Sequence, residues 1–291
     1  MVFGFLKSEK MSVSIVIDRP GMAYHAGEVI HAVVNVNAET SVKVREVTAG
    51  LMLWERYQYK ERDDEGDTKT SWTTAEQYFV KEVLVGEGTI SAGFRNTYNL
   101  DFKIPLDAVA PYNGKIVQNS WLVKVNADRP MKQDISQEVQ IPLIVPPLTQ
   151  QSQAGEYGSA SHPDDADIKF ALAGLDWVEG EQLAGKLVVR PRKNFGASSV
   201  RLELIRQEYV PRELGNTHSV TEAKVQVAGG QDFQAGFPVE FPFAIAIPRQ
   251  GCPSRRTGRS IVTWTLRAAI TRRLAKDFSV DQEVWVYNGK A

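Results

Sequence analysis

Apolar and polar residues alternate along most of the chain. In residues 47–53 and 200–204 every second position is apolar, which is the pattern of a strand that buries one face. The same alternation occurs at 100–104, 121–125 and 241–247. No window of about 15 residues carries an apolar stripe with the helical period of 3.6. Short strands separated by Gly, Pro, Asn and Asp predict antiparallel β-sandwich architecture.

The two halves of the sequence carry matching residues in the same order. The Gly-Glu pair at 27–28 corresponds to the Gly-Glu pair at 180–181 at a displacement of 153 residues. Farther on, Trp121 corresponds to Trp264 at a displacement of 143. Self-similarity of this kind indicates two copies of one structural unit.

The length of 291 residues also favours two hydrophobic cores over one. The segment 149–165 is rich in Pro, Gly, Ser and Gln, a composition typical of linkers. We therefore expect an all-β protein with two tandem antiparallel, immunoglobulin-like β-sandwich domains, at 1–148 and 166–291, joined by that linker.

Several residues are expected to specify the fold. Trp121 and Trp264 lie within alternating strands and are expected to fill the two cores. Gly27 and Gly180 fit turns that need a permissive backbone. The acidic segment 61–67 contains no apolar residue and is expected to be an exposed hairpin tip.

Composition limits the classes of function. The chain has 34 basic and 35 acidic residues, so it lacks the strongly basic character expected of a nucleic-acid-binding protein. Its single thiol, Cys252, cannot form an internal disulfide, which favours a reducing compartment. No export signal and no run of about 20 apolar residues is present. We expect a cytoplasmic protein.

The matched residues resemble the arrestin fold in both halves. The first half resembles the N-terminal arrestin domain through a Gly-Glu turn, an Ile-Pro strand end and a Trp-Leu-Val strand: Tyr24, Gly27, Glu28, Phe102, Ile104, Pro105 and Trp121. The second half resembles the C-terminal arrestin domain through the corresponding positions: Trp177, Gly180, Glu181, Phe243, Ile247, Pro248 and Trp264. This resemblance covers nearly the whole chain.

The resemblance implies an arrestin-fold protein without catalytic activity that binds proteins or membranes. The group includes arrestins, arrestin-domain trafficking adaptors, the arrestin-like subunit of retromer and bacterial sporulation-control proteins. Because the sequence ends at Ala291, a few residues after the last expected strand, we expect no autoinhibitory tail, and Pro146-Pro147 is not followed by the Tyr of a ligase-recruiting motif. We therefore expect a simpler scaffold, closest in style to the prokaryotic, sporulation-control type.

No catalytic or cofactor-binding motif is present. The sequence has no nucleophile elbow, no phosphate-binding loop, no His-Glu-x-x-His motif and no paired Cys for zinc, and His25 and His31 lack a third ligand. We expect no enzyme activity, no cofactor and no metal. One alternative is a redox or nucleophilic sensor at Cys252, because nearby cations lower the pKa of a thiol. Another is a carbohydrate-binding module that uses Trp54, Trp72 or Trp177 as platforms.

Two segments are candidate binding sites. A loop and the strand that follows it are rich in arginines, whose guanidinium groups bind carboxylates and phosphates: Arg249, Arg255, Arg256, Arg259, Arg272 and Arg273. This basic loop is expected to bind an anionic lipid or an acidic peptide. The apolar start of the chain, with Phe3, Phe5 and Leu6, is expected to contact a membrane or a partner.

The combined interpretation is a non-catalytic adaptor or scaffold. Its expected partners are proteins or membrane-associated molecules in trafficking, signalling or sporulation-type control, and nucleic acid is not among them. Unprotected sheet edges would allow a partner strand to add, or a second copy of the chain to pair.

Overall fold

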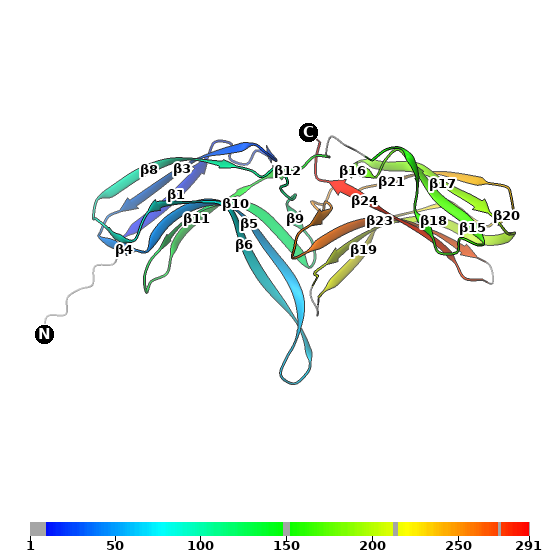
Figure 1. The fold of residues 1–291 in the computed structure, drawn as a ribbon, viewed down its shortest axis with the longest axis horizontal. Helices are drawn as coiled ribbons and strands as arrows, with labels where there is room; N and C mark the ends of the chain where they lie inside the picture. Colours follow the sequence, from blue (N-terminus) through cyan, green and yellow to red (C-terminus); the bar gives the residue numbers. More distant parts are fainter. Residues whose placement is uncertain (1–9, 148–151, 212–214, 273–274, 291) are drawn as a thin grey trace. The chain divides into compact units, whose positions relative to one another are not determined.

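The computed structural model describes residues 10–147, 152–211, 215–272 and 275–290. Every regular element in these ranges is a β-strand, which confirms the predicted all-β class (Figure 1). No helix in this part of the chain has the length and apolar composition needed to cross a bilayer.

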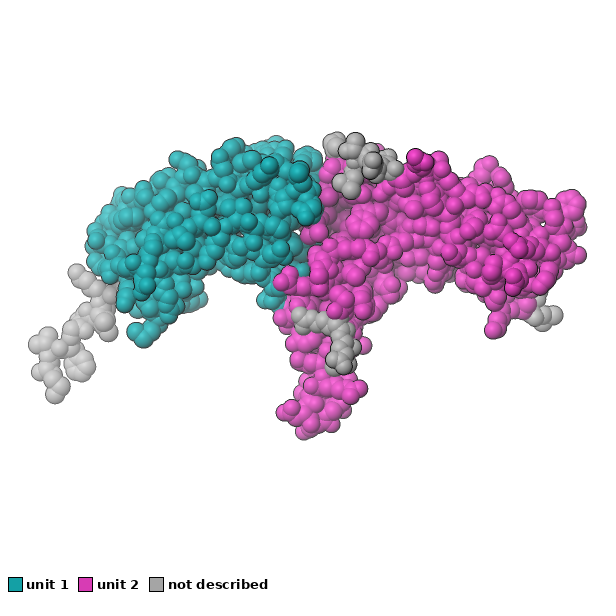
Figure 2. Space-filling view, viewed as in Figure 1, with its two compact units in different colours: residues 1–56, 74–108, 119–144 teal, residues 57–73, 109–118, 145–291 magenta. Residues whose placement is uncertain are grey.

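The chain forms two compact units (Figure 2). Unit 1 contains residues 1–56, 74–108 and 119–144, and unit 2 contains 57–73, 109–118 and 145–291. Two segments from the first half of the sequence thus belong to unit 2. The continuous domains 1–148 and 166–291 stay a prediction.

Unit 1 is built on two larger sheets (Figure 1). The first is antiparallel, with the order β1 (Met11–Ile17), β3 (Val29–Ala38), β8 (Phe94–Lys103). The second has the order β11 (Ile135–Ile141), β10 (Val117–Asp128), β5 (Glu46–Arg62), β6 (Thr68–Val85). The parts of β5, β6 and β10 within 57–73 and 109–118 belong to unit 2, as does β9 (Tyr112–Asn113), which pairs with β10. Two small pairs complete the unit: β2 (Tyr24–His25) with β12 (Leu143–Ile144), and β4 (Val42–Val44) with β7 (Gly88–Ile90).

Unit 2 also has two larger sheets (Figure 1). One has the order β13 (Gly155–Tyr157), β15 (Ala166–Leu172), β17 (Gln182–Pro191), β21 (Val239–Ala246). The other has the order β14 (Ser159–Ala160), β24 (Phe278–Tyr287), β23 (Ile261–Arg272), β18 (Phe195–Tyr209), β19 (Thr217–Ala228). Three short strands pair with its members: β16 (Asp176–Val178), β20 (Gln231–Phe233) and β22 (Arg255–Arg256).

The cores follow the alternation seen in the sequence. Every second residue of β3, from Ile30 to Ala38, is buried. Trp121 and Trp264 are 1% and 0% exposed, which confirms that both are core residues. Burying a large aromatic ring removes much apolar surface from water, so these side chains contribute strongly to stability.

The predicted turns are also confirmed. Gly27 and Gly180 have φ angles of 86° and 84°, in the left-handed region that favours glycine. At the end of the β5–β6 hairpin, the N–H of Asp63 donates to the carbonyl of Asp67 at 2.9 Å, and the acidic residues around it are mostly exposed.

Part of the segment predicted as a linker forms strands in unit 2. β13 pairs with β15, and β14 pairs with the edge of β24 at Asp281 and Val280. These short strands bury little apolar surface of their own, but an edge strand offers backbone hydrogen-bonding groups to any extended chain beside it. Composition alone did not reveal this pairing. Residues 148–151 lie outside the described ranges.

Charges of alternating sign cross the outer face of unit 2 in one row. In register, Lys224 of β19 lies beside Glu203 of β18, which lies beside Arg267 of β23, which lies beside Asp281 of β24. Lys224 is 3.0 Å from Glu203, and Arg267 is 2.7 Å from Asp281. Opposite charges at directly paired positions favour this strand register.

Candidate interaction surface

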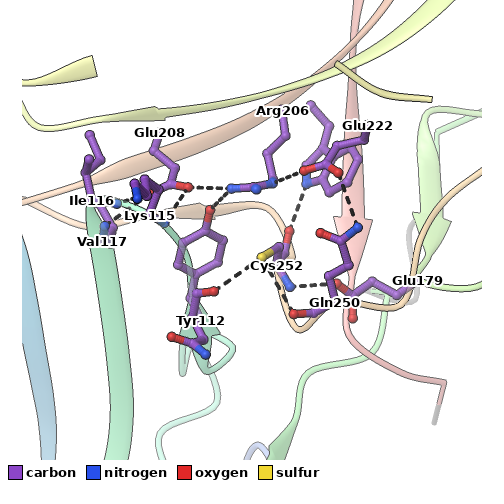
Figure 3. A network of polar contacts seen from close by, with 12 residues as sticks. Tyr112, Lys115, Ile116, Val117, Glu179, Arg206, Glu208, Glu222, Gln250 and Cys252 are labelled. Atoms are coloured by element: carbon purple, nitrogen blue, oxygen red, sulfur yellow. Dashed lines mark hydrogen bonds and ion pairs between the residues drawn. The ribbon is translucent and has the colours of Figure 1, made fainter. Parts of the chain in front are cut away.

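A buried polar cluster lies at one end of β18 in unit 2 (Figure 3). Arg206 and Glu208 occupy the core face of the strand, with side chains only 8% and 0% exposed. The Arg206 guanidinium donates to Glu222 at 2.7 Å, and also to Glu208 and to the hydroxyl of Tyr112. Arg206 thereby joins two carboxylates and a phenol contributed by three strands.

The Glu208 side chain anchors the segment 115–117 by binding the backbone N–H groups of that segment. Its carboxylate accepts the backbone N–H groups of Lys115 at 3.0 Å, Ile116 at 2.7 Å and Val117 at 3.1 Å (Figure 3). Burial raises the pKa of this carboxyl, but these N–H groups and Arg206 outweigh burial and lower the pKa below its ordinary value. Glu208 is therefore ionised at neutral pH and fully hydrogen-bonded.

Glu179 holds the loop 250–252 in the same way. Its carboxylate accepts the N–H of Cys252 at 2.7 Å (Figure 3), and the amides of Gly251 and Gln250 also bond to it. Here burial outweighs the hydrogen bonds and raises the pKa of Glu179. The loop 250–252 also contacts β9, which lies just before the segment 115–117: the N–H of Asn113 donates to the carbonyl of Gly251 at 3.2 Å.

Cys252 is an enclosed thiol in this cluster. It is 3% exposed, and its Sγ lies 3.6 Å from the carbonyl of Asn113. Burial raises the pKa of the thiol to about 11, although the charge of Arg206 lowers it, so the thiolate is scarce at neutral pH. The predicted activation by nearby arginines is wrong at this site, because burial dominates, and the sensor hypothesis loses its physical basis.

We expect the Cys252 thiol to be unreactive in the folded protein. At pH 8, an aromatic disulfide reagent should modify it at least a hundredfold more slowly than in 6 M urea, because the thiol is enclosed and protonated. Absorbance of the released thiolate measures both rates. Equal rates with and without urea would contradict the burial described here.

The polar cluster is an anchor for two loops. Its carboxylates are occupied by main-chain N–H groups or by Arg206, and no group of three potential metal ligands occurs in the described part of the chain. It orients residues 112–117 and 250–252 on the end of unit 2.

The arginines of the predicted basic loop do not form one surface. Arg255 is 1% exposed and so cannot dock a ligand from solvent. Arg256 is exposed and bonds to Glu283 at 2.6 Å. Arg259 is half-buried, and its backbone N–H donates to the hydroxyl of Thr257. Arg249 is exposed.

Arg272 lies far from Arg256, at the C-terminal end of β23. β23 begins beside Arg256 and ends at Arg272, so the two are separated by about 35 Å along the strand. The Arg272 guanidinium stacks on Phe278 at 4.4 Å and bonds to Asp165 at 3.3 Å. Proximity in sequence was misleading here, because each residue of an extended strand adds about 3.3 Å to the separation. The remaining candidates, Arg273, Phe3, Phe5 and Leu6, lie outside the described residues.

The sheet edges differ in how well they are protected. In unit 1, the edge of β1 is met by Gln137 of β11, whose side chain accepts the N–H of Ile15 at 2.9 Å. In unit 2, β13 and β14 are very short, and β21 contains Pro242, which cannot donate a ladder hydrogen bond. β8 and β19 expose no large apolar side chain among the described residues. In the part of the chain that the structure describes, β6 has none of these protections.

β6 is a long edge strand with exposed apolar side chains. It is the last strand of its sheet and contains neither Pro nor Gly over Thr68–Val85. In its unit 1 part, Phe79 is 40% exposed and Val83 is 62% exposed. Natural proteins blunt such edges, because unpaired N–H and C=O groups are a template for another strand. β6 is therefore the candidate interaction surface.

The packing behind β6 fixes its position. The Phe79 ring rests on Trp121, with centroids 4.9 Å apart. On the other face, the Tyr78 ring lies against Gly50 of β5, where an added Cβ would approach the ring to 2.9 Å. Ion pairs join Lys81 to Glu46 at 2.8 Å and Lys124 to Glu76 at 3.1 Å.

Sequence reasoning missed both the polar cluster and the identity of the open edge. A signal for the cluster was present, because the apolar alternation of β18 through Val200, Leu202 and Leu204 continues into Arg206 and Glu208. Two residues of opposite charge at positions that continue the buried alternation predict a buried ion pair. The edge carried no such signal, since strand order depends on pairing between distant segments.

The geometry defines an all-β protein of antiparallel sandwiches with an open edge strand. Residues 13–149 match the family model of the arrestin (or S-antigen) N-terminal domain. These residues, just under half of the chain, are therefore similar to the arrestin N-terminal domain, in agreement with the resemblance of the first half, and such a domain suggests a non-catalytic, protein-binding kind of role. No curated protein matches the sequence significantly.

Proposed function

We propose that the protein is an adaptor that binds an extended segment of a partner protein by strand addition to β6. The observation that carries this proposal is the unprotected edge of β6 with Phe79 and Val83 exposed along it. In strand addition, backbone hydrogen bonds supply affinity, and alternate side chains supply specificity. Phe79 and Val83 share one face of the strand, so the partner needs apolar side chains on that face.

The adaptor role agrees with the arrestin family, whose members are generally non-enzymatic. A cytoplasmic location is part of the proposal, and the enclosed free thiol of Cys252 is compatible with a reducing compartment. Contact of Phe3, Phe5 and Leu6 with a membrane belongs to the same proposal. The carbohydrate-binding alternative stays a prediction, with Trp72, 37% exposed, as its most accessible platform.

The test of strand addition compares two exposed valines of unit 1. Val83 of β6 is 62% exposed, and Val16 of β1, in the other sheet, is 58% exposed. Linear 12-residue peptides displayed on phage are selected on the wild-type chain and then titrated against Val83→Lys and Val16→Lys. We expect Val83→Lys to weaken the selected peptides at least tenfold, because a charge then faces the added strand, and Val16→Lys to leave them unchanged.

Hydrogen exchange locates the peptide. Binding should protect backbone amides of residues 77–83 and leave those of β1 as they were. Selected peptides that bind both variants equally well, or that protect another part of the chain, would refute strand addition at β6. Dimers of the free protein that Val83→Lys dissociates would show instead that a second copy occupies the edge.

A further inference from the structure

Unit 2 contains a groove made of two adjoining hollows. One hollow, of about 440 Å³, is lined by Pro146, Pro147 and Trp177 together with polar residues. The other, of about 550 Å³, is lined by Arg249 and by glycines at 180, 251 and 289. Val178, Glu181 and Lys290 line both, so the hollows adjoin. One end of the groove carries the rings of Trp177, Pro146 and Pro147, and the other end carries Arg249 and Lys290 together with Glu179 and Glu181.

The Arg249 side chain lies across the second hollow. A Cβ placed on Gly180 would lie 2.1 Å from the Nε atom of Arg249, so the arginine side chain runs directly over this glycine. Gly180 also has a positive φ of 84°, which other residues rarely adopt. Because Gly180 has no side chain, it leaves the space that the Arg249 side chain occupies on its way to the hollow.

The charge of Arg249 is not neutralised inside the described part of the chain. No hydrogen bond or ion pair to its guanidinium occurs there, whereas the neighbouring Lys290 bonds to Glu181 at 2.7 Å. The carboxylate of Glu179 is engaged by the backbone amides of the loop 250–252. Arg249 is therefore the cation that remains available at this end.

The apolar end offers a complementary surface. Trp177 and the two prolines present rings, and aromatic-lined grooves of this kind accept extended, proline-rich segments. The indole N–H of Trp177 has no acceptor in the described ranges, although it is buried. This N–H is enclosed, so Trp177 contributes to the hollow through its apolar ring.

We propose that this groove binds an extended acidic peptide, whose apolar residues pack on Trp177, Pro146 and Pro147 and whose carboxylate pairs with Arg249. A guanidinium and a carboxylate form two parallel hydrogen bonds, which favours a peptide carboxylate over a neutral group. This second surface lies entirely in unit 2 and is independent of β6. With both surfaces, the chain could hold two partner segments at once, as an adaptor requires.

The test uses a matched pair of exposed arginines. The probe is a fluorescein-labelled 12-residue peptide with the repeat Leu-Pro-Glu, and the control peptide has Gln in place of Glu. In a polyproline II helix of three residues per turn, the glutamates lie along one side. Anisotropy titrations compare the wild-type chain with Arg249→Ala and with Arg256→Ala, which changes an exposed arginine of β22 outside the groove.

We expect the Glu peptide to bind the wild type and Arg256→Ala equally, and to bind Arg249→Ala at least tenfold more weakly. The Gln peptide should bind all three weakly. Val83→Lys should bind the Glu peptide like the wild type, which separates this site from β6. Equal binding by Arg249→Ala and Arg256→Ala, or no binding of the Glu peptide at millimolar concentration, would overturn the proposal. So would Arg249-dependent binding to phosphatidylserine vesicles without peptide binding.

Discussion

Replacing Glu208 with alanine is expected to lower the free energy of unfolding of unit 2 by about 3 to 5 kcal/mol. The substitution leaves three backbone N–H groups of residues 115–117 without their acceptor and removes a buried partner of Arg206. Urea titrations followed by far-ultraviolet circular dichroism measure the loss. Hydrogen exchange should show that the amides of residues 115–117 lose protection first.

The matched control for Glu208 is Glu240, an exposed carboxylate of unit 2 that bonds to Lys186 at 2.8 Å. Glu240→Ala should change the unfolding free energy by less than about 1 kcal/mol, because exposed ion pairs contribute little. If Glu208→Ala and Glu240→Ala unfold at the same urea concentration, the anchor role assigned to Glu208 is wrong.

The same carboxylate should make stability depend on pH. Because the folded protein lowers the pKa of Glu208 below its ordinary value of 4.5, the folded state binds this proton less readily than the unfolded state. The stabilisation is therefore complete above about pH 4.5 and is lost as the pH falls through the lowered pKa. Glu208→Gln, which cannot ionise, should lose less stability than the wild type over that acidic range.

Replacing Gly50 with alanine is expected to destabilise unit 1 by about 1 to 3 kcal/mol or more. The new Cβ would lie 2.4 Å from the carbonyl oxygen of Val80 and 2.9 Å from the Tyr78 ring. The backbone contact cannot be relieved by a rotamer change, so β6 must move away from β5. Thermal unfolding and hydrogen exchange of β6 measure the effect.

Gly88→Ala is the control for this effect. Gly88 lies in β7 of the same unit, and a Cβ there would meet no atom within 4 Å. Its substitution should change stability by about 0.5 kcal/mol or less. Equal melting temperatures for Gly50→Ala and Gly88→Ala would show that β6 does not pack on Gly50 as described.

The features that the sequence predicted correctly depend on short-range rules. Period-two alternation identified the strands. The positive φ of Gly27 and Gly180 agrees with the prediction of turns that need the permissive backbone of glycine. The burial of Trp121 and Trp264 followed from their place within alternating strands. Each of these features depends on residues only a few positions apart, so a short stretch of sequence is enough to predict it.

The features that it did not predict depend on long-range pairing. Arg255 looked like a surface cation beside Arg256, but β22 pairs with β23 and turns the first of the two inward. Cys252 looked activated until its burial was known. The main-chain partners of Glu208 lie more than 90 positions away in the sequence. Such contacts arise from topology, and no local pattern encodes them.

The two carboxylate anchors hold their loops through main-chain amides of those loops. Glu208 holds residues 115–117, and Glu179 holds the loop that presents Gln250 and Gly251. The outward side chains of these loops can therefore be exchanged without loosening the attachment. Related proteins could retain one scaffold while diversifying the chemistry displayed at this end, and a library randomised at Lys115 should keep folding, whereas the Gln250 amide also donates to Glu222 at 3.3 Å.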